Sequence, residues 1–137
     1  MRSFKYLEAW KKCRQIRQEI WIVVKAFPAE GKYRLSDQMI RSSRSPSTQI
    51  AEGYGRYHFQ ENVQFCRIAR GSLYEVLDHL TVSLDSVYIS PEKHDQFETL
   101  TIECIRLING YINYLIKAKY SSLEGEVNDE YQNYETY

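Results

Sequence analysis

Four long stretches of the chain repeat apolar residues at steps of three and four, and this spacing constrains the fold more than any other feature. The stretches run over about residues 4–27, 35–56, 60–87 and 91–119. Steps of three and four place apolar side chains on one face of an α-helix. Because the 137 residues include only three prolines and six glycines, turn-rich all-β folds are disfavoured. The pattern predicts an all-α, antiparallel up-and-down four-helix bundle over residues 1–120.

The second stretch has the weakest helical pattern. Its centre, residues 41–49, is rich in serine, and serine competes with the helix for backbone hydrogen bonds. Pro46 lies inside it and should kink the helix or break its hydrogen-bond ladder. This stretch alone does not predict a continuous helix. Before it, we expect a loop over residues 29–34 and an N-cap at Ser36.

Several local features have specific structural readings. Ser90 followed by Pro91 predicts an N-cap and the first residue of the fourth helix. Gly71-Ser72, in the middle of the third stretch, predicts close approach by a neighbouring helix. Gly53 is suited to end a helix with positive φ, and the carboxylate of Glu52 to pair with a nearby arginine.

The first stretch carries a second row of residues beside its apolar face. This row consists of Leu7, Trp10, Arg14, Arg17, Trp21 and Val24. A helix in a monomeric bundle needs to bury one stripe only. The second row is therefore a candidate interface with another subunit, which suggests a bundle assembled as a ring.

Charge is distributed unevenly although the net charge is zero. Residues 1–70 contain 14 Lys and Arg against 6 Asp and Glu, whereas residues 71–137 contain 4 against 12. Such polarity indicates either an anionic partner for the first half or pairing between the two halves. In a ring with head-to-tail interfaces, opposite charges on the two faces can set the register between subunits.

Seven cationic residues are candidates for binding nucleic-acid phosphates. They are Lys32, Arg34, Arg41, Arg44, Arg56, Arg67 and Arg70. Lysine and arginine bind phosphates with little demand on sequence. Tyr54, Tyr57, His58 and Phe59 lie beside Arg56 and can stack on unpaired bases. The alternative, that the basic residues serve subunit pairing, stays open, and both roles can hold together.

Catalytic, metal and cofactor sites are not predicted. No nucleophile or Walker motif occurs, and Gly53-Tyr54-Gly55 lacks the third glycine of a dinucleotide site. Glu75 precedes His79 by four residues, whereas a di-iron bundle needs Glu-x-x-His twice. The three cysteines lack metal or disulfide spacing and indicate reduced core thiols. With no leader or membrane-length apolar run, these features predict a soluble cytoplasmic protein without membrane contact.

Two glycine-bearing motifs resemble a known family. Residues 49–56 read QIAEGYGR and residues 65–75 read FCRIARGSLYE. Together with residues 27–28 and 35–38, they resemble the bacterial 23S rRNA intervening-sequence proteins over residues 4–120. Two departures are Gln49, where the family usually has Asn, and Pro46, where it often has an aliphatic residue.

The resemblance implies a four-helix bundle that assembles as a homopentamer. A related branch comprises the accessory variability proteins of diversity-generating retroelements, which are basic pentamers that bind nucleic acid and a reverse transcriptase. Our hypothesis is a non-enzymatic oligomer that binds RNA or another nucleic acid. The alternative is a ring that recruits a protein, such as a reverse transcriptase, through the acidic half or through residues 121–137, which we expect to be a mobile tail.

Overall fold

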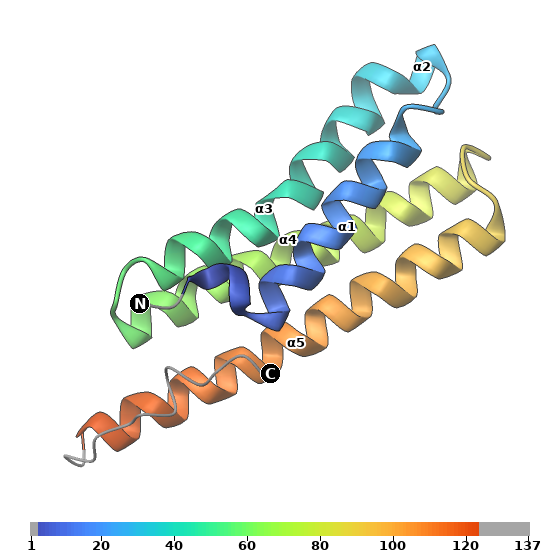
Figure 1. The fold of residues 1–137 in the computed structure, drawn as a ribbon. Coiled ribbons are helices and arrows are strands. Elements are labelled where there is room, and N and C mark those ends of the chain that lie inside the picture. The colour runs from blue at the N-terminus through green and yellow to red at the C-terminus, as the bar shows by residue number, and fades with distance from the viewer. Residues whose placement is uncertain (1–2, 124–137) are drawn as a thin grey trace.

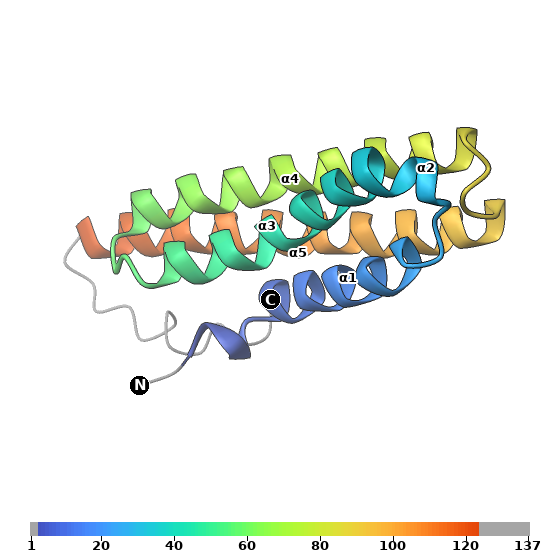
Figure 2. The same cartoon turned by 90° about the horizontal axis from the view of Figure 1, so that it is seen from above.

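The computed structural model describes residues 3–123 and has the predicted four-helix bundle (Figure 1). The four long helices are α1 (Glu8–Val24), α3 (Asp37–Tyr54), α4 (Phe59–Asp85) and α5 (Pro91–Leu123). Three short elements join them: η1 (Phe4–Tyr6), α2 (Ala29–Gly31) and η2 (Lys32–Ser36). Helix α1 contacts α3 and α5, and α4 also contacts both, so that successive long helices pack antiparallel around one core (Figure 2).

The boundaries of the bundle differ slightly from those predicted. Helix α5 continues to Leu123, so residues 121–123 extend the last helix. The rest of the expected tail, residues 124–137, lies outside the described part of the chain. Within residues 3–123, none of the helices is both long and apolar enough to cross a membrane.

The core is built from the predicted apolar stripe of each long helix. Ile16, Ile50, Leu73 and Ile108, one from each helix, have no exposed surface. A polar link lies among them, because Asn62 Nδ2 donates to the hydroxyl of Tyr111 at 3.0 Å. A buried polar pair of this kind is stable only when it is hydrogen-bonded.

Helix α3 is continuous through Pro46, so the doubt raised by the sequence was wrong. The hydroxyls of Ser42, Ser43 and Ser47 donate to carbonyls of the preceding turn, at 3.3, 3.1 and 3.3 Å. These serines and Pro46 are buried, and the Ser72 hydroxyl of α4 donates to Ser45 at 2.8 Å. The small side chains therefore suit close packing against the neighbouring helices. Figure 2 shows α3 changing direction along its length, as an internal proline leads one to expect.

The connection into α3 also differs from the expected loop and cap. Residues 29–36 form helical turns, which lead directly into α3. Ser36 has helical φ and ψ of −58° and −45°, and its side chain makes no capping hydrogen bond. The predicted N-cap at Ser36 is wrong because the helical backbone already continues through this residue.

The other helix ends bear out part of the local analysis. The Ser90 hydroxyl accepts a hydrogen bond from the Lys93 N–H at 3.1 Å, which confirms the predicted cap. Arg56 and Glu52 form the expected ion pair at 3.3 Å. His58, which the sequence analysis missed, caps α4 by accepting from the Glu61 N–H at 3.4 Å.

The prediction for Gly53 is wrong, whereas that for Gly71-Ser72 holds at Ser72 and not at Gly71. Gly53 does not have positive φ, and it is buried against α4: a Cβ there would lie 2.8 Å from both Asn62 Oδ1 and Phe65 Cβ. Gly71 has nothing within 4 Å of its Cβ position and is exposed, but Ser72 is buried and contacts Ser45 of α3 at 2.8 Å. Helices α3 and α4 therefore approach closely at Gly53 and at Ser72. Among non-glycine residues, positive φ values fall on Tyr57 (55°) and Val87 (61°) in the two turns.

We predict opposite effects of alanine at these two glycines. Gly53→Ala should lower the free energy of unfolding by about 1–3 kcal/mol, because Phe65 Cβ is part of the α4 framework and cannot swing aside. Gly71→Ala should raise it by about 1 kcal/mol through helix propensity alone. Urea denaturation of both variants tests this, and similar effects at the two positions would contradict it.

Candidate nucleic-acid interface

Cationic side chains gather where α1 lies beside α3. We call this surface the basic seam, and it consists of Arg14, Arg17 and Trp21 on α1, Lys25 directly after α1, and Arg44 on α3. Antiparallel packing of α1 and α3 brings these residues together from positions up to 30 apart in the chain. The Arg17 Nη1 atom donates to the Ser47 hydroxyl at 2.8 Å and so joins the two helices.

Trp21 is the centre of the seam. Its side chain is 44% exposed, and two cations lie over its ring: Lys25 Nζ at 5.0 Å and Arg44 Cζ at 5.3 Å from the centroid. At such distances the negative ring face attracts a cation, by about 0.5–1 kcal/mol at an exposed site. The tryptophan therefore holds two positive charges at the surface of the seam.

Trp10 lies deeper at the other end of the seam. It is 8% exposed, and Phe4 packs edge-on against it at 5.3 Å between ring centroids. Arg14 and Arg17 lie over its ring at 5.8 and 5.9 Å. Leu7 and Val24, each 4% exposed, are also buried in the bundle of one chain.

The second row of the first helix is thus split. Leu7, Trp10 and Val24 belong to the hydrophobic core of the chain itself. This corrects the expectation that the whole row needs a second subunit to cover it. Arg14 and Trp21 are exposed, and Arg17 is half-buried. The reason is that η1 folds over the start of α1, so that Phe4 covers Trp10, which sequence periodicity does not show. That the row contacts another subunit stays a prediction.

The seven predicted phosphate ligands fall into two groups. Arg34 and Arg41 lie near the start of α3, Arg44 lies near its middle, and all three are exposed. Lys32 lies on the connection before α3, but its side chain is outside the described structure. Arg56 follows the end of α3, and Arg67 and Arg70 lie on α4, where Arg70 contacts Asn109 of α5. Because Arg44 lies instead over Trp21 of α1, the set does not form a single continuous patch.

The second group is also more engaged. Arg56 pairs with Glu52 and lies 5.2 Å from the ring centroid of Phe65, and Arg70 Nη1 donates to Asn109 Oδ1 at 2.8 Å. By contrast, none of the carboxylates in residues 3–123 forms an ion pair with a cation of the basic seam. The seam therefore keeps more uncompensated positive charge than this second group of arginines.

The charge asymmetry has a clear spatial form. Residues 3–58, which form η1 to α3, contain 11 Lys and Arg against 5 Asp and Glu, a net charge of +6. Residues 59–123, which form α4 and α5, contain 6 against 8, a net charge of −2. Lys12 and Glu103, 3.4 Å apart, form the ion pair between α1 and α5. One long side of the bundle is thus basic and the other mildly acidic.

A family model, described as 23S rRNA-intervening sequence protein, matches residues 5–110. The chain belongs to this family. The match spans α1, α3, α4 and most of α5, and it includes every residue of the basic seam. The family resemblance read from the two glycine motifs is thereby confirmed.

A solved structure extends the comparison. It is a protein of unknown function from the S23 ribosomal protein family of Bacteroides thetaiotaomicron, with a TM-score of 0.71. The two chains are 19% identical, over 76% of this chain and 97% of the other. At this identity the likeness shows a shared fold. No curated protein is significantly similar to the chain.

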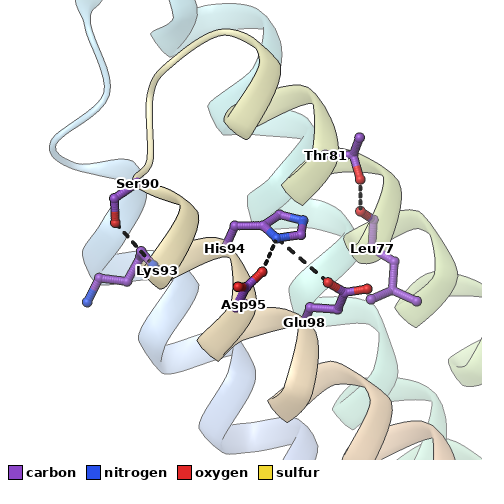
Figure 3. Close-up of polar contacts among 7 residues, drawn as sticks. All are labelled: Leu77, Thr81, Ser90, Lys93, His94, Asp95 and Glu98. Atoms are coloured by element: carbon purple, nitrogen blue, oxygen red, sulfur yellow. Dashed lines mark hydrogen bonds and ion pairs between the residues drawn. The ribbon is translucent and has the colours of Figure 1, made fainter.

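One group of side chains in this family member has the composition of a metal site, but its geometry is local. His94 Nδ1 lies 3.1 Å from Asp95 Oδ1 and 3.6 Å from Glu98 Oε2, at the start of α5 (Figure 3). All three residues come from one helix, and neighbours such as Thr81 bond within α4 instead. The imidazole and the two carboxylates are close enough to be one another's polar partners. We therefore assign these residues to stabilising the first turns of α5.

His79 and the cysteines likewise have structural partners. The Ser42 hydroxyl and His79 Nδ1 lie 3.0 Å apart between α3 and α4. Burial raises the pKa of the Cys66 thiol to about 12, against a smaller lowering by Arg70. A hydrogen bond with Cys104, followed by burial, raises the pKa of Cys13. A thiol held protonated is a poor nucleophile.

We predict that the two tryptophans differ in their importance for folding. Trp10→Ala should lower the free energy of unfolding by about 3–5 kcal/mol, since it removes a buried ring. Trp21→Ala should cost less than about 1.5 kcal/mol, because the ring is exposed and loses mainly cation–π contacts. Urea denaturation followed by circular dichroism distinguishes the two, and equal losses would refute the assignment of Trp10 to the core.

Proposed function

We propose that the chain binds RNA through the basic seam. The observation that carries this proposal is the set of cations on α1 and α3 that lack carboxylate partners, on a half of the bundle with a net charge of +6. Cations that are not neutralised within the chain attract counterions, and release of those counterions favours binding to a polyanion. The family's name, which refers to sequences within 23S rRNA, supports RNA as that polyanion.

The seam also suits unpaired bases. The guanidinium planes of Arg14 and Arg44 are held at tryptophan rings and so lose part of their freedom before binding. Guanidinium planes and aromatic rings are surfaces on which splayed-out bases stack. Single-stranded or looped RNA is thus the expected ligand.

Charge reversal on the seam tests the proposal. Arg14→Glu with Arg44→Glu should weaken binding of a looped RNA at low salt at least tenfold, and the slope of log K against log salt should fall by about 0.7 per lost phosphate contact. The matched control is Lys93→Glu with Arg106→Glu, which changes net charge equally on α5. Fluorescence anisotropy across a salt series provides both quantities. Equal weakening by the two variants would show that only net charge matters and would refute a binding surface at the seam.

We further propose that the chain self-associates through the outer face of α1. Ile22 is 66% exposed and its neighbour Trp21 is 44% exposed, on a helix that otherwise presents polar groups outward. Large apolar side chains that are exposed close together are typical of subunit interfaces. The family resemblance suggests five copies in a ring. The interface and the RNA surface then adjoin at Trp21.

A pair of matched isoleucines tests this second proposal. Ile22→Glu should convert the oligomer to monomer while the helix content stays unchanged, because Ile22 is not part of the core. Ile68→Glu, at an isoleucine of α4 that is 52% exposed, should leave the assembly intact. Light scattering after size-exclusion chromatography gives the mass of each. If Ile22→Glu keeps the mass of the parent chain, α1 is not the interface.

A further inference from the structure

A groove lies between the start of α4 and the end of α5, away from the basic seam. Its volume is about 230 Å³. Its floor is apolar, with Phe59 and Val63 from α4 facing Leu115 and Ile116 from α5. Pockets for drug-sized ligands measure about 300–1,000 Å³, so this one has room for a side chain or a short peptide segment.

The rim of the groove is basic. Arg67 and Lys119 line it from opposite helices. In the surrounding parts of α4 and α5, residues 59–72 and 108–123, there are four Lys and Arg and one carboxylate, that of Glu61. An apolar floor between two cations fits an acidic segment that carries an aromatic side chain.

The chain itself contains a segment of this chemistry. Residues 124–137, which lie outside the described structure, contain five Asp and Glu, no Lys or Arg, and tyrosines at positions 131, 134 and 137. No segment of equal length within residues 3–123 combines this charge with three tyrosines. Charge and ring content are thus complementary to the rim and floor of the groove.

The connection also permits docking within one chain. The groove residue Tyr120 is about one helical turn from Leu123, where α5 ends in the structure. Tyr131 is eight positions after Leu123, and that length of extended chain spans up to about 27 Å. A short tether of this kind gives the segment an effective concentration in the millimolar range, so weak contacts are sufficient.

From this complementarity we propose that residues 124–137 bind back onto the groove of the same chain. A tyrosine ring fills the apolar floor, and the neighbouring carboxylates pair with Arg67 and Lys119. Because the tail then covers part of the cationic end of the bundle, it leaves the basic seam as the main cationic surface. The docking itself does not depend on whether the seam binds RNA.

Photo-crosslinking in the full chain tests this proposal. The photoreactive residue benzoylphenylalanine, placed at position 134, should on irradiation become joined to peptides that contain Val63 or Ile116, as read by mass spectrometry. Arg67→Glu with Lys119→Glu should lower the yield of these cross-links about fivefold to tenfold, since two attractions become repulsions. The control, Lys93→Glu with Arg106→Glu, should leave the yield unchanged.

Three outcomes would overturn the proposal. Cross-links that lie only outside the groove would exclude the site. A yield that the charge reversal at Arg67 and Lys119 does not change, with helix content retained, would exclude charge pairing; Arg67→Gln with Lys119→Gln replaces that variant if it unfolds. In a mixture of isotopically light and heavy chains, cross-links between light and heavy peptides would assign the groove to the tail of another copy. RNA binding is measured separately, on variants of Arg14 and Arg44, so the two proposals fail independently.

Discussion

The close approach of α3 to α4 at Gly53 is the constraint on which the rest of the bundle depends. A side chain at this position would collide with Phe65 and Asn62. The two helices can therefore lie this close together only because Gly53 has no side chain. Asn62 in turn donates to the buried hydroxyl of Tyr111 on α5. The contact at Gly53 and the hydrogen bond between Asn62 and Tyr111 therefore fix α3, α4 and α5 relative to one another near the start of α4. The hydrogen bond matters because a buried polar group without a partner is costly.

Helix α1 packs across this frame, and its position decides the chemistry of the surface. Since α1 lies antiparallel to α3, its arginines meet the serine-rich centre of α3, where Arg17 donates to Ser47. The same packing places Trp21 between Lys25 and Arg44. Small hydroxyl side chains, which are weak helix formers, are used here because they let a neighbouring helix and its long cations come close. The basic seam is thus a consequence of how α3 is packed.

The two proposed surfaces use charge in different ways. On the seam, cations without carboxylate partners retain their attraction for a polyanion, and tryptophan rings restrict where those charges lie. At the groove, Arg67 and Lys119 flank an apolar floor, which favours a segment that offers rings as well as carboxylates. Five of the negative charges that make the second half of the sequence acidic lie in residues 124–137, whereas α4 and α5 are only mildly acidic. Charge counted over the second half of the sequence therefore overstates the acidity of α4 and α5 themselves.

Much of the fold could be predicted from the sequence, and the candidate site only in part. Apolar spacing determined four helices and their core stripes, and Ser90 with Pro91 determined where α5 begins, because both depend on residues within a few turns of each other. Tertiary structure decided which glycine admits a neighbouring helix, since Gly53 and Gly71 differ only in what lies opposite them.

Tertiary structure likewise decided that Trp10 is buried while Trp21 is exposed, although both point in nearly the same direction from α1. It also placed Arg44 beside α1 and Arg70 beside α5, although the sequence groups both with the same set of cations. Periodicity states which residues share a helix face. What covers that face depends on contacts between segments distant in the chain, and these are decided only when the helices pack.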